Sequence, residues 1–402
     1  MALGKQYAGM WTLSQQMQAV SGRTWTGIPA VPSLWSWGRG HVGQMGNNTN
    51  LHRSSPVQVD SGVTWTDIDA GNQFTGAVKS DGTLWLWGGN TYGGLGNGLT
   101  TDLNSRSSPV QLGTATDWSI VSIGNYQANA IKTNGTLWFW GDNSTGESGT
   151  NETNSRGKSS PVQVGALTNW AKIVTLNSVT VAIKTDGTLW AWGGNAAGQV
   201  GNNTIVSKSS PVQIGAGTDW YELAGHSKGP IAQKTNGTIW TWGPNNNDVD
   251  TSGGILGLND TIHRSSPVQI GADTDWVLAE KGNANSRTTL LRKTNGSLWG
   301  FGYNSYGTIG HNFTGKVSSP VQVGALTTWS KVTVTSGAGL AVKTDGTLWS
   351  QGGGADYGQL GNNLSGATSY RSSPVQVGTG TQWTDVYGGF QHVLALQSIP
   401  GT

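Results

Sequence analysis

The chain contains no cysteine and little charge. Of its 402 residues, 23 are Lys or Arg and 21 are Asp or Glu, so the formal net charge is only +2. Without cysteine the chain cannot form a disulfide, a Cys-ligated zinc site or a thiol nucleophile. A balance this close to neutral argues against nucleic-acid binding, which needs a strong basic excess. No apolar run approaches the ~20 residues of a transmembrane helix, so we expect no membrane span.

Recognisable catalytic motifs are also missing. The sequence has six histidines but no HExxH zinc motif, no GxSxG nucleophile turn and no phosphate-binding loop. His52 and His263 stand at equivalent places before Arg53 and Arg264, which favours a structural role for both. We therefore expect no enzyme activity, no catalytic residue and no cofactor.

The dominant feature of the sequence is a repeat of 50 to 56 residues. Ser-Pro-Val-Gln occurs seven times, and a tryptophan follows each proline by nine residues. A second motif, mostly Leu-Trp-x-Trp-Gly, also recurs seven times, although Phe301 and Gln351 replace its second tryptophan in the last two copies. Two tryptophans that lie two apart on a strand share one face, so we expect these rings to pack between repeats. The first tryptophans are Trp35, Trp85, Trp138, Trp190, Trp240, Trp299 and Trp349.

Each repeat indicates strands rather than helices. Asp-Gly or Asn-Gly separates two short β-rich runs in six places, as at Asp81–Gly82 and Asn134–Gly135. Such pairs predict hairpins, and a type I′ turn would need positive φ at both central residues. The prolines suit the entry of a strand, where no backbone N–H is needed.

The seventh hairpin is divided between the two ends of the chain. Residues 392–397 match the strand before the turn, and residues 34–38 match the strand after it. Pairing these two strands would close a ring and remove its free sheet edges. The sequence therefore predicts an all-β fold, a seven-bladed β-propeller over residues 33–402, with residues 1–32 as a leader and linker.

The repeat resembles that of the regulator of chromosome condensation family. The resemblance rests on G-T-L-W-x-W-G-x-N-x-x-G-x-x-G followed by S-S-P-V-Q-V-G, and covers about residues 33–397. It implies the same seven-bladed, RCC1-like propeller. It implies little about function, because members of the family include an exchange factor, adaptors and inhibitors.

Repeat lengths vary most at a six-residue insertion within Pro244–Gly254. Oxygen-bearing side chains stand there at every second position, followed by Gly253, which loosely resembles a calcium loop without its completing glutamate. A solvated polar loop is the simpler interpretation. The calcium candidates are Asn246, Asp248, Asp250 and Ser252.

The first thirty residues carry a second resemblance. Residues 7–19, YAGMWTLSQQMQA, followed by a tryptophan and a Gly/Pro-rich linker, look like the leader of structural proteins of marine tailed phages, especially cyanophages. This resemblance implies attachment to other virion proteins. An extra strand or plug lying on the propeller is the alternative. The candidate attachment residues are Tyr7, Met10, Trp11, Leu13, Met17 and Trp25.

Together these features favour a phage virion protein, on the particle exterior as a capsid decoration or tail component. Its partners would be other virion proteins, a host-surface glycan or protein, and further copies of itself within the particle. Two alternatives stay open: a secreted or cytosolic protein-binding propeller, such as an inhibitor or adaptor, and a carbohydrate-binding propeller. Rim aromatics with Asn and Asp nearby would favour the last.

Overall fold

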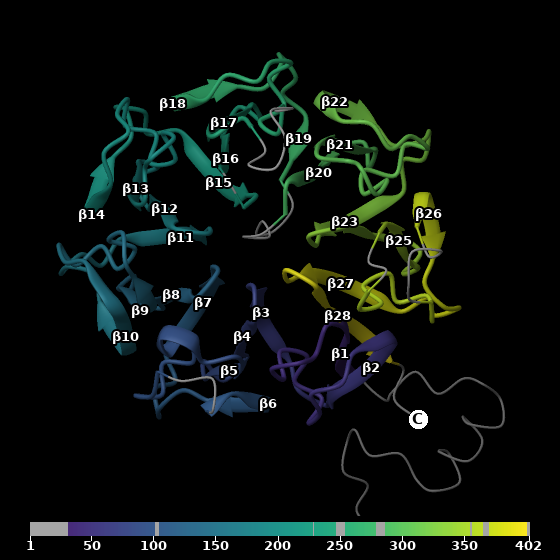
Figure 1. Cartoon of the computed structure of the whole chain (residues 1–402), viewed down its shortest axis with the longest axis horizontal. Coiled ribbons are helices and arrows are strands. Elements are labelled where there is room, and N and C mark those ends of the chain that lie inside the picture. Colours follow the sequence, from purple (N-terminus) through teal and green to yellow (C-terminus); the bar gives the residue numbers. More distant parts are fainter. Residues whose placement is uncertain are drawn as a thin grey trace, which may run out of the picture.

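The strands form seven four-stranded antiparallel sheets arranged around a ring (Figure 1). This computed structural model describes residues 31–100, 104–227, 229–246, 254–278, 286–353, 356–364 and 370–399. Apart from one short 3-10 helix, η1 (Thr91–Gly93), every regular element within those ranges is a strand. The predicted seven-bladed β-propeller is therefore confirmed.

Each sheet is one blade, and its strands are called a, b, c and d from the ring centre outward. Strands a of blades 1 to 7 are β3 (Trp65–Ala70), β7 (Trp118–Ile123), β11 (Trp170–Thr175), β15 (Trp220–Gly225), β19 (Trp276–Val277), β23 (Trp329–Val334) and β27 (Trp383–Gly388). Strands b are β4 (Phe74–Lys79), β8 (Gln127–Lys132), β12 (Val179–Lys184), β16 (Pro230–Lys234), β20 (Thr288–Lys293), β24 (Ala338–Lys343) and β28 (His392–Ile399).

The two outer strands of each blade carry the two sequence motifs. Strands c, with the paired aromatic motif, are β5 (Leu84–Gly88), β9 (Leu137–Asn143), β13 (Leu189–Gly193), β17 (Ile239–Gly243), β21 (Leu298–Gly302), β25 (Leu348–Gly352) and β1 (Val31–Gly38). Strands d, with Ser-Pro-Val-Gln, are β2 (Arg53–Ser61), β6 (Arg106–Gln111), β10 (Asn154–Gln163), β14 (Lys208–Gln213), β18 (Arg264–Gln269), β22 (Val317–Gln322) and β26 (Arg371–Gln376).

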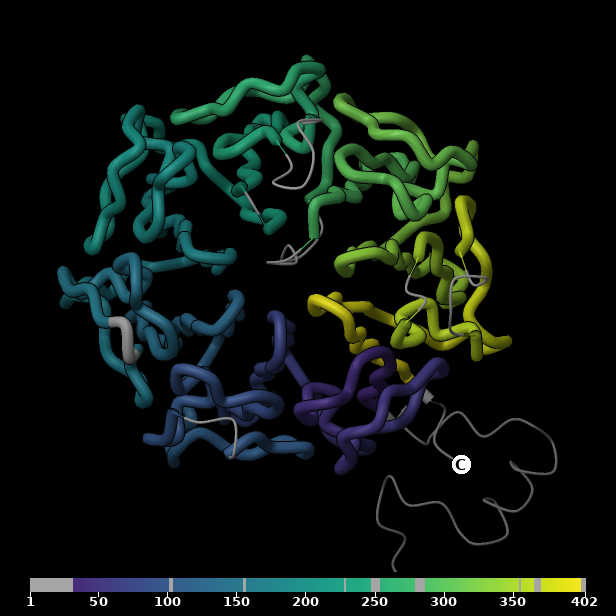
Figure 2. The backbone as a smooth tube through the Cα atoms, in the orientation of Figure 1, coloured from purple at the N-terminus to yellow at the C-terminus, as the bar shows by residue number. Residues whose placement is uncertain are grey.

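Blade 7 closes the ring, because its strands come from both ends of the chain (Figure 2). β1 pairs with β28 along its whole length, from Val31 opposite Ile399 to Gly38 opposite His392. β1 thus begins two residues before the predicted propeller boundary. The imidazole of His392 is fully buried beside the Thr75 hydroxyl, and this burial lowers its pKa to about 3. A neutral histidine therefore lies between blade 7 and blade 1.

The six Asp-Gly and Asn-Gly hairpins do form, but not as type I′ turns. Only the glycine has positive φ, as at Gly82 with φ +78°, and its N–H donates to the carbonyl of Lys79. The Asp81 carboxylate instead accepts from the backbone N–H and hydroxyl of Thr83. These bonds hold a three-residue loop with glycine at the left-handed position, which is the alternative hairpin for such sequences.

The hydrophobic core lies between blades rather than at the ring centre. One cluster joins Leu86 and Leu95 of blade 1 to Trp118, Val121 and Trp140 of blade 2, and comparable clusters span other blade boundaries. Because both faces of each sheet are covered in this way, the blades hold one another in place.

Candidate binding surfaces

In five blades the second tryptophan of strand c joins its blade to the preceding one. Trp192 is completely buried, and its indole N–H donates to the carbonyl of Glu147 in blade 2 at 2.9 Å. Four further indoles make the equivalent bond: Trp37, Trp87, Trp140 and Trp242. A glycine fits against each ring, as Gly149 does against Trp192, where a Cβ atom would come within 2.8 Å. These tryptophans are structural, as the sequence predicted.

The first tryptophans of the motif are only partly buried, and they stabilise the b–c hairpin of their own blade. In six blades the indole N–H donates to the Thr or Ser after the turn, as from Trp190 to Thr188 at 2.8 Å. In six blades this ring also contacts the tryptophan of strand a of its own blade. In blades 1 to 6 a lysine lies over the tryptophans of strands a and c, as Lys184 does with its Nζ 3.5 Å from the centre of Trp190. Trp35 in the divided blade lacks the turn, and its indole N–H has no partner among the described residues.

Gln351 replaces an inter-blade tryptophan at the boundary of blades 5 and 6. Its side chain is fully buried against Gly310, yet neither its amide nitrogen nor its amide oxygen finds a partner among the described residues. An unpaired buried polar group destabilises by about 1–3 kcal/mol.

We therefore expect Gln351→Met, which keeps the length of the side chain, to raise the free energy of unfolding by about 1–2 kcal/mol. Urea denaturation of the two chains measures this difference. An unchanged or lower midpoint in the Met variant would mean that an ordered water pairs with the amide.

Length variation is concentrated on one face of the ring. The b–c hairpins and the d–a connections, such as 112–117 and 214–219, have nearly constant lengths and lie together at one end of the strands. The a–b and c–d connections meet at the other end, here called the loop face, since strands a and c run in the same direction. The c–d connections vary most in length. Residues 144–153 form this connection in blade 2, whereas residues 244–263 form it in blade 4. Binding sites are usually built on such loops over a rigid scaffold.

Buried asparagines hold the c–d loops in place. Asn304 accepts a hydrogen bond from the backbone N–H of Ile309, and its amide donates to the carbonyls of Phe313 and Gly315. At the insertion, Asn245 accepts from the N–H of Leu256 and so preserves the base of the loop. Of the calcium candidates, only Asn246 is described, partly buried; Asp248, Asp250 and Ser252 lie outside the described residues. The calcium site stays a prediction.

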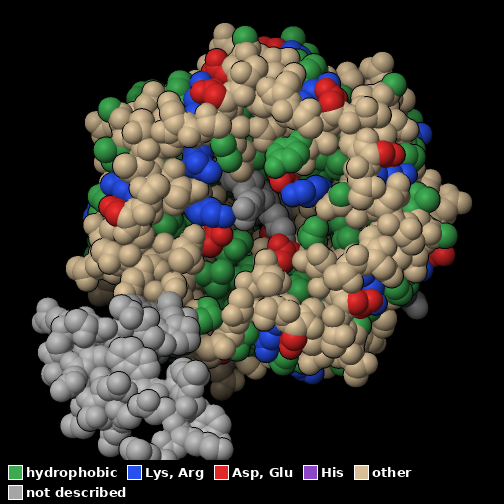
Figure 3. All heavy atoms as spheres, turned by 180° about the vertical axis from the view of Figure 1, so that it is seen from behind, with side chains coloured by type: hydrophobic (Ala, Val, Ile, Leu, Met, Phe, Trp, Pro, Cys, Tyr) green, Lys and Arg blue, Asp and Glu red, His purple; other side chains and the backbone are tan. Residues whose placement is uncertain are grey.

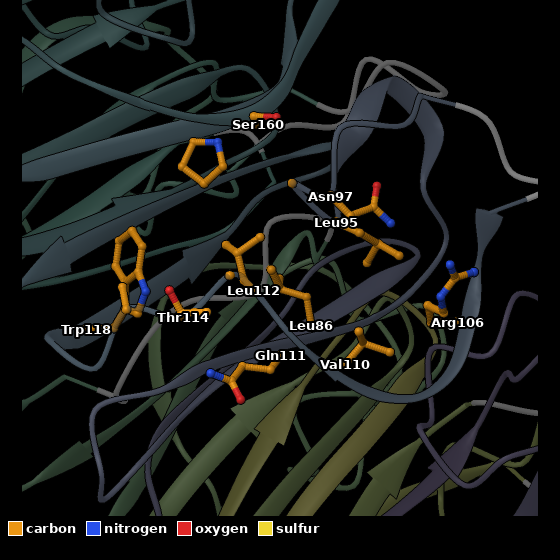
Figure 4. A pocket seen from close by; sticks show the side chains of 14 residues that line it. Leu86, Leu95, Asn97, Arg106, Val110, Gln111, Leu112, Thr114, Trp118 and Ser160 are labelled. Carbon is orange, nitrogen blue, oxygen red and sulfur yellow. The ribbon is translucent and has the colours of Figure 1, made fainter.

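Shallow grooves also lie between the outer parts of neighbouring blades. The groove between blades 1 and 2 has a volume of about 490 Å³, and Figure 4 shows Trp118, Leu86, Leu112 and Gln111 around it. Equivalent residues line grooves at two other boundaries, beside Trp220 and beside Trp329. Because these linings are the constant residues of the repeat, we interpret the grooves as a consequence of blade packing.

A set of tyrosines on the loop face was not predicted from the sequence. Tyr92, Tyr306 and Tyr357 each stand directly before the glycine that turns the c–d loop. Each ring contacts another aromatic ring across or beside a blade boundary. The Tyr-Gly pair that recurs at this position in three repeats could have indicated these tyrosines from the sequence.

The remaining predicted sites are structural or lie beyond the described residues. The Nδ1 atoms of His52 and His263 accept from the backbone N–H groups of Gly40 and Asn245, so both fix c–d loops. All six attachment candidates lie within residues 1–30, outside the described residues. Within the described ranges no group of three or more His, Asp or Glu side chains could hold a metal ion, and no helix has the length and hydropathy of a membrane span.

Comparison with known proteins identifies the class of propeller. Residues 33–78, 81–131 and 186–220 match the regulator of chromosome condensation (RCC1) repeat. Human WBSCR16 has a TM-score of 0.77 and 18% identity, with 92% of this chain and 99% of that one aligned. Prp20p of Saccharomyces cerevisiae has a TM-score of 0.75 and 16% identity, over 93% and 94% of the two chains. The chain carries RCC1 repeats and folds as an RCC1-like propeller.

Curated relatives share only part of their length with this chain. The human E3 ubiquitin-protein ligase HERC2 is 24% identical over 195 residues, which cover 46% of this chain and 4% of HERC2. The ultraviolet-B receptor UVR8 of Arabidopsis thaliana is 31% identical over 170 residues, which cover 41% of this chain and 38% of UVR8. The similarity therefore covers only part of the length of either relative.

Proposed function

We propose that the chain is a structural protein of a tailed-phage particle. Residues 1–30 attach it to other virion proteins, and the propeller is displayed on the particle exterior. The observation that carries the proposal is the completeness of the ring: all seven blades are formed from Val31 onward, and β1 is paired on both sides. The preceding residues, whose sequence resembles phage leaders, are thus not needed for any blade.

The surface of the propeller suits display. Figure 3 shows one face of the ring, on which Lys, Arg, Asp and Glu side chains are interspersed and most of the surface is uncharged. This face offers no large basic patch for nucleic acid. Under this proposal the protein is not an enzyme and needs no cofactor.

A truncation tests the attachment. We expect a chain that starts at Ala30 to melt at the same temperature as the full chain but not to join particles from a phage deleted for the gene. Trp11→Ala in the full chain should weaken joining in the same assay. Tyr221→Ala, which removes an aromatic ring that is 60% exposed on β15, is the matched control and should join normally. Normal joining by the truncated chain would place the attachment in the propeller and overturn this role of the leader.

The runner-up is a carbohydrate-binding propeller, favoured by the tyrosines on the loop face. The two functions are compatible, because a virion propeller that meets the host could bind a surface glycan.

A further inference from the structure

The tyrosines of the loop face are not required by the repeat. The position of Tyr92, Tyr306 and Tyr357 is taken in other described copies by Val42, Thr145 and Ala197, which precede equivalent glycines. A blade therefore closes this turn without an aromatic ring, and the tyrosines of blades 1, 5 and 6 need another explanation.

Three tyrosines gather where blade 5 meets blade 6. The centre of the Tyr306 ring lies 6.0 Å from that of Tyr303 and 5.5 Å from that of Tyr370. Tyr306 is 39% exposed and Tyr370 45% exposed, so both rings offer surface to solvent. We call these three residues the tyrosine platform.

Buried residues next to the platform hold its rings in position. Gly353 lies under two of its rings, where a Cβ atom would come within 2.9 Å of Tyr306 Cβ and 3.0 Å of Tyr370 Cε1. The bonds of Asn304 to Ile309 and Phe313 fix the loop that carries Tyr303 and Tyr306. A rigid arrangement lowers the entropy lost when a ligand binds.

One acidic and one basic residue are found beside the platform. Tyr303, burial and Tyr370 raise the pKa of Tyr306, and the exposed Asp356 adds a smaller contribution in the same direction. The Tyr306 hydroxyl therefore stays protonated and can donate. Arg371 supplies one positive charge, and its guanidinium donates to the Tyr370 carbonyl. These two groups carry opposite charges, so together they favour neither an anionic nor a cationic ligand.

We propose that the tyrosine platform binds one neutral sugar ring of a glycan. The C–H groups on one face of the sugar lie against the electron-rich faces of Tyr306 and Tyr370, and Asp356 accepts a sugar hydroxyl. Three partly exposed rings offer far less than the ~800 Å² per partner of a standard protein interface, which favours a sugar over a protein. This inference rests on the display part of the proposed function and names its ligand class.

A glycan array of neutral oligosaccharides, built from glucose, galactose, mannose and N-acetylglucosamine, tests the site with the full chain. We expect binding to at least one class, reduced about tenfold or more by Tyr306→Ala and by Tyr370→Ala. Tyr306→Phe keeps the ring face and should bind within about threefold of the unmodified chain. Tyr221→Ala, the exposed aromatic on strand a of blade 4, should bind unchanged.

Melting temperatures measured beside the array separate loss of a ligand from loss of the fold. Absence of glycan binding by the folded chain overturns the proposal. So does binding that both alanine variants retain, or capture by the platform of host-surface protein stripped of its glycans. Each of these results leaves the virion location standing, because attachment is measured independently by the truncation at Ala30.

Discussion

Removal of β28 is expected to abolish the folded monomer. A chain that ends at Gly389 loses the strand that lies between β27 and β1, together with the fully buried His392, Val393 and Leu394. Both pairings of the closing strand disappear, and β1 is left with an unpaired edge. The free energy of unfolding of a typical domain is only about 5–15 kcal/mol. We expect the loss of a central strand from one blade to cost more than this. The open β1 edge then invites pairing with other chains.

Size-exclusion chromatography and thermal unfolding measure the effect. The shortened chain should aggregate or elute as oligomers, and should show no cooperative melting transition. A chain that ends at Ile399 keeps the whole of β28 and is the matched control, which should melt as the full chain does. A monomeric, cooperatively melting product of the larger deletion would refute closure by the terminal strands.

Trp192→Ala is expected to lower the free energy of unfolding by about 3–5 kcal/mol, the usual cost of emptying a buried aromatic site. The indole is completely buried, rests on Gly149 and donates to the carbonyl of Glu147 in the neighbouring blade. Its removal leaves a cavity between blades 2 and 3 and an unpaired carbonyl. Trp192→Phe keeps most of the ring and should cost less.

Trp190→Ala is the control within the same strand. Trp190 is partly buried, and its indole bonds only within the hairpin of its own blade, so we expect a smaller loss. Chemical denaturation of the three variants gives the comparison. Equal losses at Trp190 and Trp192 would contradict the assignment of the inter-blade joint to the second tryptophan.

The repeat made the architecture predictable because its markers are residues with narrow backbone preferences. Proline, glycine and the Asp-Gly pairs recur at fixed intervals, and a strand that is missing at one end of the chain is found at the other. The turn type was predicted wrongly. It depends on the Thr83 hydroxyl and backbone N–H that hold the Asp81 carboxylate, an interaction between side chain and backbone that the Asp-Gly pair alone does not specify.

The separate roles of the two tryptophans could not be predicted from their spacing. Trp190 and Trp192 share one face of β13, and only the position of the neighbouring blade makes Trp192 fully buried and leaves Trp190 partly buried. The tyrosine platform was equally hidden, because Tyr303 and Tyr370 are distant in sequence and meet only through the packing of blades 5 and 6. Residues 1–30 lie outside the described structure, so the role of the leader rests on its sequence.

Mass spectrometry of purified particles tests the proposed function most directly. The proposal places the gene in the genome of a tailed phage, so the particles to be tested are those of that phage, banded by density gradient and washed at high salt. The proposal predicts peptides from this chain in a constant ratio to the major capsid protein across independent preparations. Absence of these peptides from the particles, with the chain recovered from the lysate or the medium, would contradict it.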